Sequence, residues 1–69
     1  MKELVFNKPN KVIYTNYKLE TEEWDIVPFK LWFGHTQYHL EDCWLVNAYD
    51  LNKMAIRDFK LNDMYVLMD

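Results

Sequence analysis

The sequence spaces two histidines and its single cysteine four residues apart, at His35, His39 and Cys43, with Glu41 and Asp42 beside them. On a helix the three would share one face, and imidazole and thiolate are ligands that Zn²⁺ prefers. The segment has the composition of a polar loop between two strands, however, and structural zinc sites usually contain cysteine pairs or a helical histidine pair. We therefore expect histidines without a metal, and no cofactor.

One pair could supply a catalytic nucleophile, the thiol of Cys43 with the imidazole of His39. Such a pair needs an exposed thiolate and a third group that orients the base. Because Cys43 begins an apolar segment, a buried and unreactive thiol is the better interpretation. The sequence also lacks a phosphate-binding glycine loop. We expect that the chain is not an enzyme, and a small metal-using hydrolase is the most distant alternative.

Arg57, the only arginine, alternates with Ala55 and Phe59, so it shares an otherwise apolar strand face. A guanidinium in such a place requires a carboxylate, a carbonyl group or an anionic ligand. An internal salt bridge is the better interpretation, since a half-buried charge is usually paired within the protein. Its candidate partners are Asp50, Asp58 and Asp63.

Aromatic residues make up 17% of the chain, more than one small core can enclose. We expect some of these rings to stay exposed, where they could stack on a base or another planar ligand. The alternative is that they pack against the segment Glu3 to Phe6, the C-terminal segment or a second subunit. The rings concerned are Tyr14, Tyr17, Trp24, Trp32, Tyr38, Trp44 and Tyr49.

Period-two alternation of side chains predicts the strands that would position these residues. They are Lys11 to Lys18, Trp24 to Gly34, Cys43 to Tyr49 and Met54 to Phe59, with Val66 to Met68 as a last short strand. Asp50 to Lys53 supplies a tight turn. Leu61 to Met64 could form a short helical turn.

Two further features shape the predicted strands. Pro28 lies inside the longest apolar run and cannot donate a backbone hydrogen bond, so that strand either lies at an edge or bends there. The turn from Lys18 to Glu23 has Leu19 in its middle and no glycine, so we expect no residue with positive φ in it.

Length and charge limit the class of protein. Sixty-nine residues make one domain, residues 1–69, with a net charge of −3. This charge argues against strong non-specific binding to nucleic acid, although a local lysine cluster would allow local binding. No run approaches the ~20 apolar residues of a membrane span, and no signal peptide is evident. We therefore expect a cytoplasmic protein without a membrane partner.

Several spaced segments of this chain agree in order with one known pattern. They are Tyr14, Val27-Pro28-Phe29-Lys30-Leu31, Trp44-Leu45-Val46, Ala48-Tyr49-Asp50 and Arg57-Asp58-Phe59-Lys60-Leu61. This order resembles the signature of the WYL domain, found mostly in bacterial transcription regulators. Trp32-Phe33-Gly34 and the loop around His39 are similar to short stand-alone proteins of that kind from bacteria and phages.

The resemblance implies a mainly β fold, a small SH3-like barrel of the Sm type with about five strands. It also implies a regulatory module that binds single-stranded nucleic acid, a nucleotide or another anionic ligand through aromatic and basic residues. By position, the implied ligand-binding residues are Arg57, Trp44 and His39, with Trp32 and Tyr14 as stacking partners. From the exposed aromatics, the alternative is a protein that binds another protein or its own copy.

Overall fold

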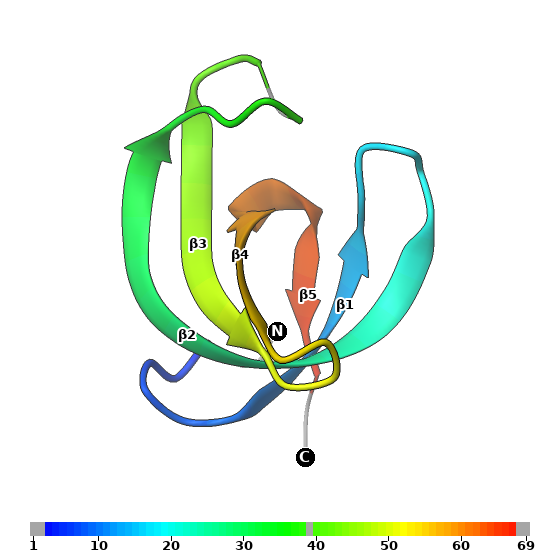
Figure 1. The fold of residues 1–69 in the computed structure, drawn as a ribbon, viewed down its shortest axis with the longest axis vertical. Coiled ribbons are helices and arrows are strands. Elements are labelled where there is room, and N and C mark those ends of the chain that lie inside the picture. Colours follow the sequence, from blue (N-terminus) through cyan, green and yellow to red (C-terminus); the bar gives the residue numbers. More distant parts are fainter. Residues whose placement is uncertain (1–2, 39, 68–69) are drawn as a thin grey trace.

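The computed structural model describes residues 3–38 and 40–67, and it is mostly β, as predicted. Five antiparallel strands form one sheet in the order β4-β3-β2-β1-β5 (Figure 1). The strands are β1 (Asn10–Thr15), β2 (Thr21–Gly34), β3 (Cys43–Asp50), β4 (Ala55–Lys60) and β5 (Met64–Val66). The predicted helical turn is the 3₁₀ helix η1 (Leu61–Asp63) between β4 and β5.

The sheet curls around its core but does not close, so the predicted barrel is only an approximate description. β4 and β5 are its two edges. The last strand was predicted at Val66 to Met68, of which Met68 lies outside the described residues; within them the strand is Met64–Val66, which pairs with β1. In the described residues, no helix has the length and apolar character needed to cross a membrane.

β2 is the strand that lets one sheet surround a core. Its first half pairs with β1 and its second half with β3, so β2 is central in the strand order while each half pairs on one side only. The register shifts between Pro28 and Lys30, which leaves Phe29 as the extra residue of a bulge. The bend predicted at Pro28 is therefore confirmed. The edge alternative also holds locally, because at Pro28 the strand pairs with β3 and has no strand on its other side.

The core lies on the concave side of the curled sheet. Its buried residues come from all five strands: Val12, Tyr14, Ile26, Val46, Ala48, Phe59, Met64 and Val66. At its lower end the buried Asn10 holds the N-terminal segment, because its side chain accepts from the Val5 N–H and donates to the carbonyls of Val5 and Lys8. The segment Glu3 to Phe6 is thus an arm and not a strand.

The β1–β2 and β3–β4 hairpin turns use side-chain oxygens in place of glycine. In the β1–β2 turn, Asn16 Oδ1 accepts from the N–H groups of Lys18 and Glu20. The expectation of no positive φ in this turn is wrong, because Leu19 has φ 65°. In the β3–β4 turn, Met54 has φ 55°, so β4 begins one residue later than predicted.

Candidate functional site

A cleft of about 660 Å³ follows the open edge of β4. One wall is β4 from Ala55 to Phe59, and the other carries aromatic residues of β1, β2 and the loops, with Thr36 to Tyr38 from the β2–β3 loop. Small-molecule sites usually enclose roughly 300–1,000 Å³. The cleft is therefore large enough for a ligand of nucleotide size.

Arg57 lines this cleft and forms an ion pair with the buried Asp50. Its Nε is 3.2 Å from Asp50 Oδ2, and the Asp50 side chain has no exposed surface, whereas 44% of the Arg57 side chain is exposed. This is the internal salt bridge that the sequence allowed, with Asp50 as the partner. Asp50 Oδ2 is buried and accepts no hydrogen bond, so the charge of Arg57 is what compensates it.

The other oxygen of Asp50 shapes the turn that carries β4. Oδ1 accepts from the backbone N–H groups of Asn52, at 2.9 Å, and Lys53, at 3.2 Å. This is the capping of its own backbone that the sequence predicted for Asp50. One carboxylate therefore fixes both the turn and the guanidinium.

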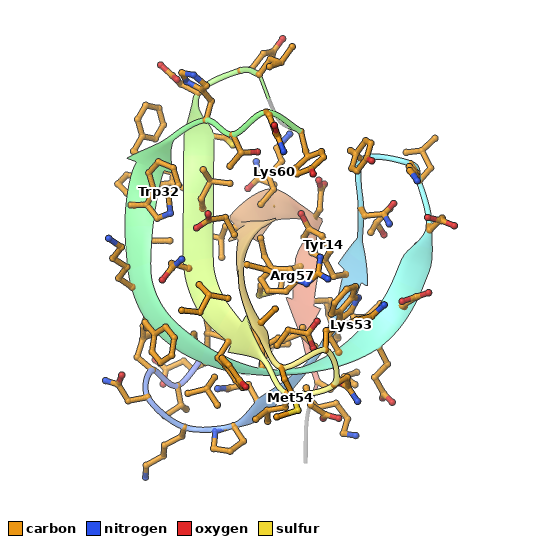
Figure 2. The ribbon with its side chains drawn as sticks, in the orientation of Figure 1. Tyr14, Trp32, Lys53, Met54, Arg57 and Lys60 are labelled. Carbon is orange, nitrogen blue, oxygen red and sulfur yellow. The ribbon has the colours of Figure 1, made fainter. Side chains whose placement is uncertain are left out.

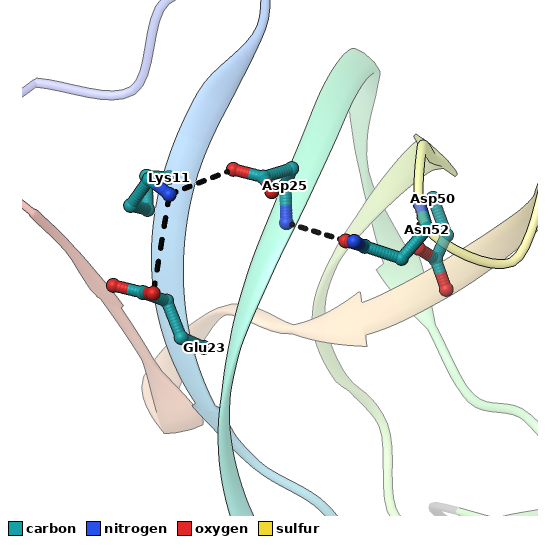
Figure 3. A network of polar contacts seen from close by, with 5 residues as sticks. All are labelled: Lys11, Glu23, Asp25, Asp50 and Asn52. Carbon is teal, nitrogen blue, oxygen red and sulfur yellow. Dashed lines mark hydrogen bonds and ion pairs between the residues drawn. The ribbon is translucent and has the colours of Figure 1, made fainter.

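The turn is also tied to β2 (Figure 3). The N–H of Leu51 donates to the carbonyl of Asp25. The N–H of Asp25 donates to Asn52 Oδ1, at 3.3 Å. Lys11 Nζ lies 3.3 Å from Asp25 Oδ1 and 3.9 Å from Glu23 Oε2. These exposed ion pairs stabilise little, so the two hydrogen bonds are what position the turn.

Trp24 lies on the far side of the Arg57 guanidinium. Arg57 Cζ is 5.6 Å from the centre of the Trp24 ring, within cation–π distance. The buried ring of Phe59 makes T-shaped contacts with Trp24, at 5.5 Å between ring centres, and with Tyr14, at 4.9 Å. The floor of the cleft is thus a rigid packing of three rings beneath one cation.

Two tyrosines form the rim. Tyr17 of the β1–β2 turn stacks on Tyr38 of the β2–β3 loop, with ring centres 5.0 Å apart, and Lys18 Nζ lies 5.7 Å from the Tyr17 centre. The same loop is braced by His35, whose Nδ1 is 3.0 Å from Asp42 Oδ1. The rim therefore joins two loops far apart in sequence and carries a cation at its edge.

Tyr14 connects this floor to the end of β4. Its hydroxyl oxygen accepts the N–H of Lys60 at 2.9 Å. Burial raises the pKa of Tyr14 above its usual 10.0, and the hydrogen bond from Lys60 partly offsets that rise. The phenol is therefore a structural group that stays protonated at neutral pH.

The structure brings together only part of the predicted site. Arg57 and Tyr14 both line the cleft and point toward the open centre of the sheet, whereas Trp32 lies on the β2 side (Figure 2). Trp44 is not in the cleft lining; it is half exposed and packs against Phe33 at 5.2 Å. The predicted contribution of His39 lies outside the described residues.

Trp32 makes structural contacts, and its predicted stacking role stays a prediction. Its Nε1 donates to Asp58 Oδ1 at 3.0 Å, and Asn47 Nδ2 donates to the same oxygen at 3.1 Å. Its ring covers Gly34, where an added Cβ would lie 2.6 Å from Trp32 Cζ3. Trp32 thus explains why the only glycine stands at position 34 and links β2 to β4 across β3.

The cleft residues missing from the predicted site include the aromatic residues Trp24, Tyr17 and Tyr38. The sequence included them in its aromatic set but gave no reason to prefer them. Trp24 lies opposite Val12 on β1, which directs its ring toward the core and Arg57. The register between β1 and β2 is what places Trp24, and not Trp44, in the cleft. The alternation of side chains within one strand does not determine that register.

Within residues 3–38 and 40–67, no three His, Cys, Asp or Glu side chains are grouped so that they could hold a metal ion. The considered zinc set includes His39, so it lies partly outside this range. Comparisons of the chain with protein-family models, with characterised proteins and with solved structures gave no match.

Proposed function

We propose that this protein is a non-enzymatic binding module whose cleft takes a nucleotide or a short single-stranded nucleic acid. The observation that carries the proposal is the half-exposed Arg57, fixed by buried Asp50 over the ring of Trp24. A guanidinium plane backed by an indole is a surface on which bases stack. The resemblance to WYL domains supports the same class of ligand.

Arg57 keeps hydrogen-bonding capacity for an anion. Its Nε faces Asp50, and its two terminal nitrogens carry four further N–H donors in a planar fork. Such a fork suits the oxygens of a phosphate group. Lys18, at the rim, adds a second positive charge near the mouth of the cleft. The arrangement favours a single phosphate contact and not a long, strongly charged duplex.

The net charge of the chain agrees with a ligand that brings only about one phosphate to the site. The net charge is −3, and Asp58 also lines the cleft, so the site does not attract nucleic acid from a distance. We expect weak, shape-dependent binding of a mononucleotide or short single strand, with a small salt dependence that reflects about one phosphate.

Calorimetric titration tests this function. Adenosine monophosphate, cytidine monophosphate and a short single-stranded oligonucleotide are titrated into wild-type protein at two salt concentrations. Arg57→Lys keeps the charge but loses the planar fork and should weaken binding by about 10-fold or more, since one charge-assisted contact contributes about 1.5–3 kcal/mol. Trp44→Phe, which lies outside the cleft, is the control and should bind as wild type. Binding unaffected by Arg57→Lys would contradict the proposal.

A second candidate function, protein–protein association, has its own observation. Phe29, Leu31, Phe33 and Trp44 are all 43–57% exposed on β2 and β3, and Phe33 contacts Trp44. Exposed aromatic and aliphatic side chains are enriched at interfaces. Sedimentation of wild type against Phe33→Ser tests it, because a self-association lost in the variant would favour this function.

A further inference from the structure

The hydrogen bond between Lys60 and Tyr14 shows which way the edge of β4 faces. Lys60 lies opposite Leu45 of β3, yet its N–H donates to the Tyr14 hydroxyl. Lys60 and Leu45 are therefore not a hydrogen-bonded pair. Such pairs alternate along an antiparallel ladder, so Asp58 and Ile56 also direct their main-chain N–H and C=O groups away from β3.

These main-chain groups face the cleft. The Asp58 and Ile56 side chains project from the face of β4 opposite to Arg57, since side chains alternate along a strand, yet both residues line the same cleft as Arg57. Among the turn, loop and side-chain hydrogen bonds of residues 3–38 and 40–67, none involves the main chain of Ile56 or Asp58. By this alternation, two N–H donors and two carbonyl acceptors point toward the cleft beside the Arg57 guanidinium.

The unpaired edge of β4 is short, because something limits it at each end. At one end the Tyr14 hydroxyl already occupies the N–H of Lys60, and at the other end the turn after Asp50 ends the strand. Two residues with free groups are fewer than a strand normally needs, about 3–10 residues. The far wall is formed by rings instead of a second strand. This geometry favours a small planar ligand over an extended peptide.

A second copy of the chain fits the edge poorly. If β4 paired antiparallel with β4 of a second copy, the unpaired edges of the two strands would have to face each other. Only two registers then keep most of the two strands paired. One places Arg57 opposite Arg57 and the other places Asp58 opposite Asp58. Like charges directly opposite each other destabilise a strand pair.

We propose that the main-chain groups of Ile56 and Asp58 form hydrogen bonds with the edge of a nucleobase that stacks beside Arg57. This inference rests on the proposed function and names its contact. The carbonyl of Ile56 accepts from the amino group of adenine or cytosine, and the N–H of Asp58 donates to the neighbouring ring nitrogen. The ligand class is a nucleotide whose base has a donor next to an acceptor, which every free Watson–Crick edge offers.

The test removes one N–H and leaves every side chain unchanged. A chain of 69 residues can be assembled by chemical synthesis, with the Asp58 amide replaced by an ester that has no N–H. An ester at Leu40, an exposed loop residue outside the cleft lining, is the matched control. Circular dichroism and melting temperature confirm that both analogues fold.

Adenosine monophosphate and purine riboside monophosphate, which lacks the amino group, are titrated into all three proteins. We expect the Asp58 ester to weaken binding of adenosine monophosphate by about 5- to 10-fold, as the loss of one hydrogen bond predicts, and the Leu40 ester to have no effect. Purine riboside monophosphate should bind wild type more weakly by a similar factor.

Two results would overturn the inference in distinguishable ways. If adenosine monophosphate binds wild type and the Asp58 ester equally, the base-edge contact is wrong while the proposed function stands. If neither adenosine nor cytidine monophosphate binds wild type, the proposed function fails and the contact with it. Protection of the Ile56 and Asp58 amides by an extended peptide, without nucleotide binding, would assign the edge to a protein partner.

Discussion

Replacement of Asp50 by alanine should be one of the most destabilising changes in this chain. The Asp50 carboxylate has no exposed surface, and it receives the N–H groups of Asn52 and Lys53 and faces Arg57 at 3.2 Å. Each lost hydrogen bond costs about 1 kcal/mol here, because water reaches the exposed turn and replaces part of it. The lost ion pair and the small cavity add about 1 kcal/mol more, which is below the roughly 3–5 kcal/mol for breaking a fully buried pair because Arg57 is half exposed and water reaches its charge.

The sum, about 3 kcal/mol, is large for this chain. At roughly 0.05–0.15 kcal/mol per residue, a domain of 69 residues has about 3–10 kcal/mol of unfolding free energy. The melting temperature should fall by about 12–24 °C, at roughly 4–8 °C per kcal/mol. Urea denaturation followed by circular dichroism measures the free energy directly.

Asp58→Ala is the matched control. Asp58 is also a β-sheet aspartate that accepts two hydrogen bonds, from Trp32 and Asn47, but it is exposed. Its replacement should cost about 1 kcal/mol or less. Equal costs for Asp50→Ala and Asp58→Ala would refute the reasoning that burial of Asp50 makes the difference. In a double-mutant cycle, Asp50→Asn with Arg57→Met should show a coupling of about 0.5–3 kcal/mol.

Three further predictions concern other positions. Tyr14→Phe should cost about 1 kcal/mol, because the Lys60 N–H loses its acceptor. Since burial raises the pKa of Tyr14, the folded state holds the phenol proton more tightly than the unfolded state. The stability that this group contributes is therefore full below pH 10.0 and is lost at higher pH. Denaturation measured as a function of pH should show this loss for wild type and not for Tyr14→Phe. Gly34→Ala should cost about 1–3 kcal/mol and shift the Trp32 indole resonance, because the new Cβ collides with the ring; an unshifted resonance would contradict this. Leu19→Gly should stabilise by about 0.5–1 kcal/mol in urea denaturation, because Leu19 has φ 65° and is 84% exposed; destabilisation would mean that its side chain packs.

The strands could be predicted because alternation is a local property. Val12, Tyr14, Val46 and Ala48 recur every second residue and all are buried in the core. Pro28 marked the bend for the same local reason, since it has no N–H to donate. The prediction for the β1–β2 turn was wrong because a side chain there takes the place of a glycine. Asn16 accepts backbone hydrogen bonds in this turn, which allows Leu19 to have positive φ.

The site was harder to predict because it depends on the register between strands. Arg57 stood out as a lone cation on an apolar face, and one of its three candidate partners proved to be Asp50. Trp24 and Trp44 are equally prominent in the sequence. The β1–β2 register turns Trp24 toward Arg57, and the β2–β3 register pairs Trp44 with Phe33 at the surface. No pattern within one strand contains that difference.

The most direct test of the account is a nuclear magnetic resonance titration of the protein with adenosine monophosphate. It follows the three indole N–H signals and the Arg57 Nε signal in one series of spectra. We expect saturable shifts of Trp24 and Arg57, with the Trp44 indole unchanged. Shifts confined to Trp44, or no shift at Trp24 and Arg57 at saturating nucleotide, would contradict the assignment of this cleft as the ligand site.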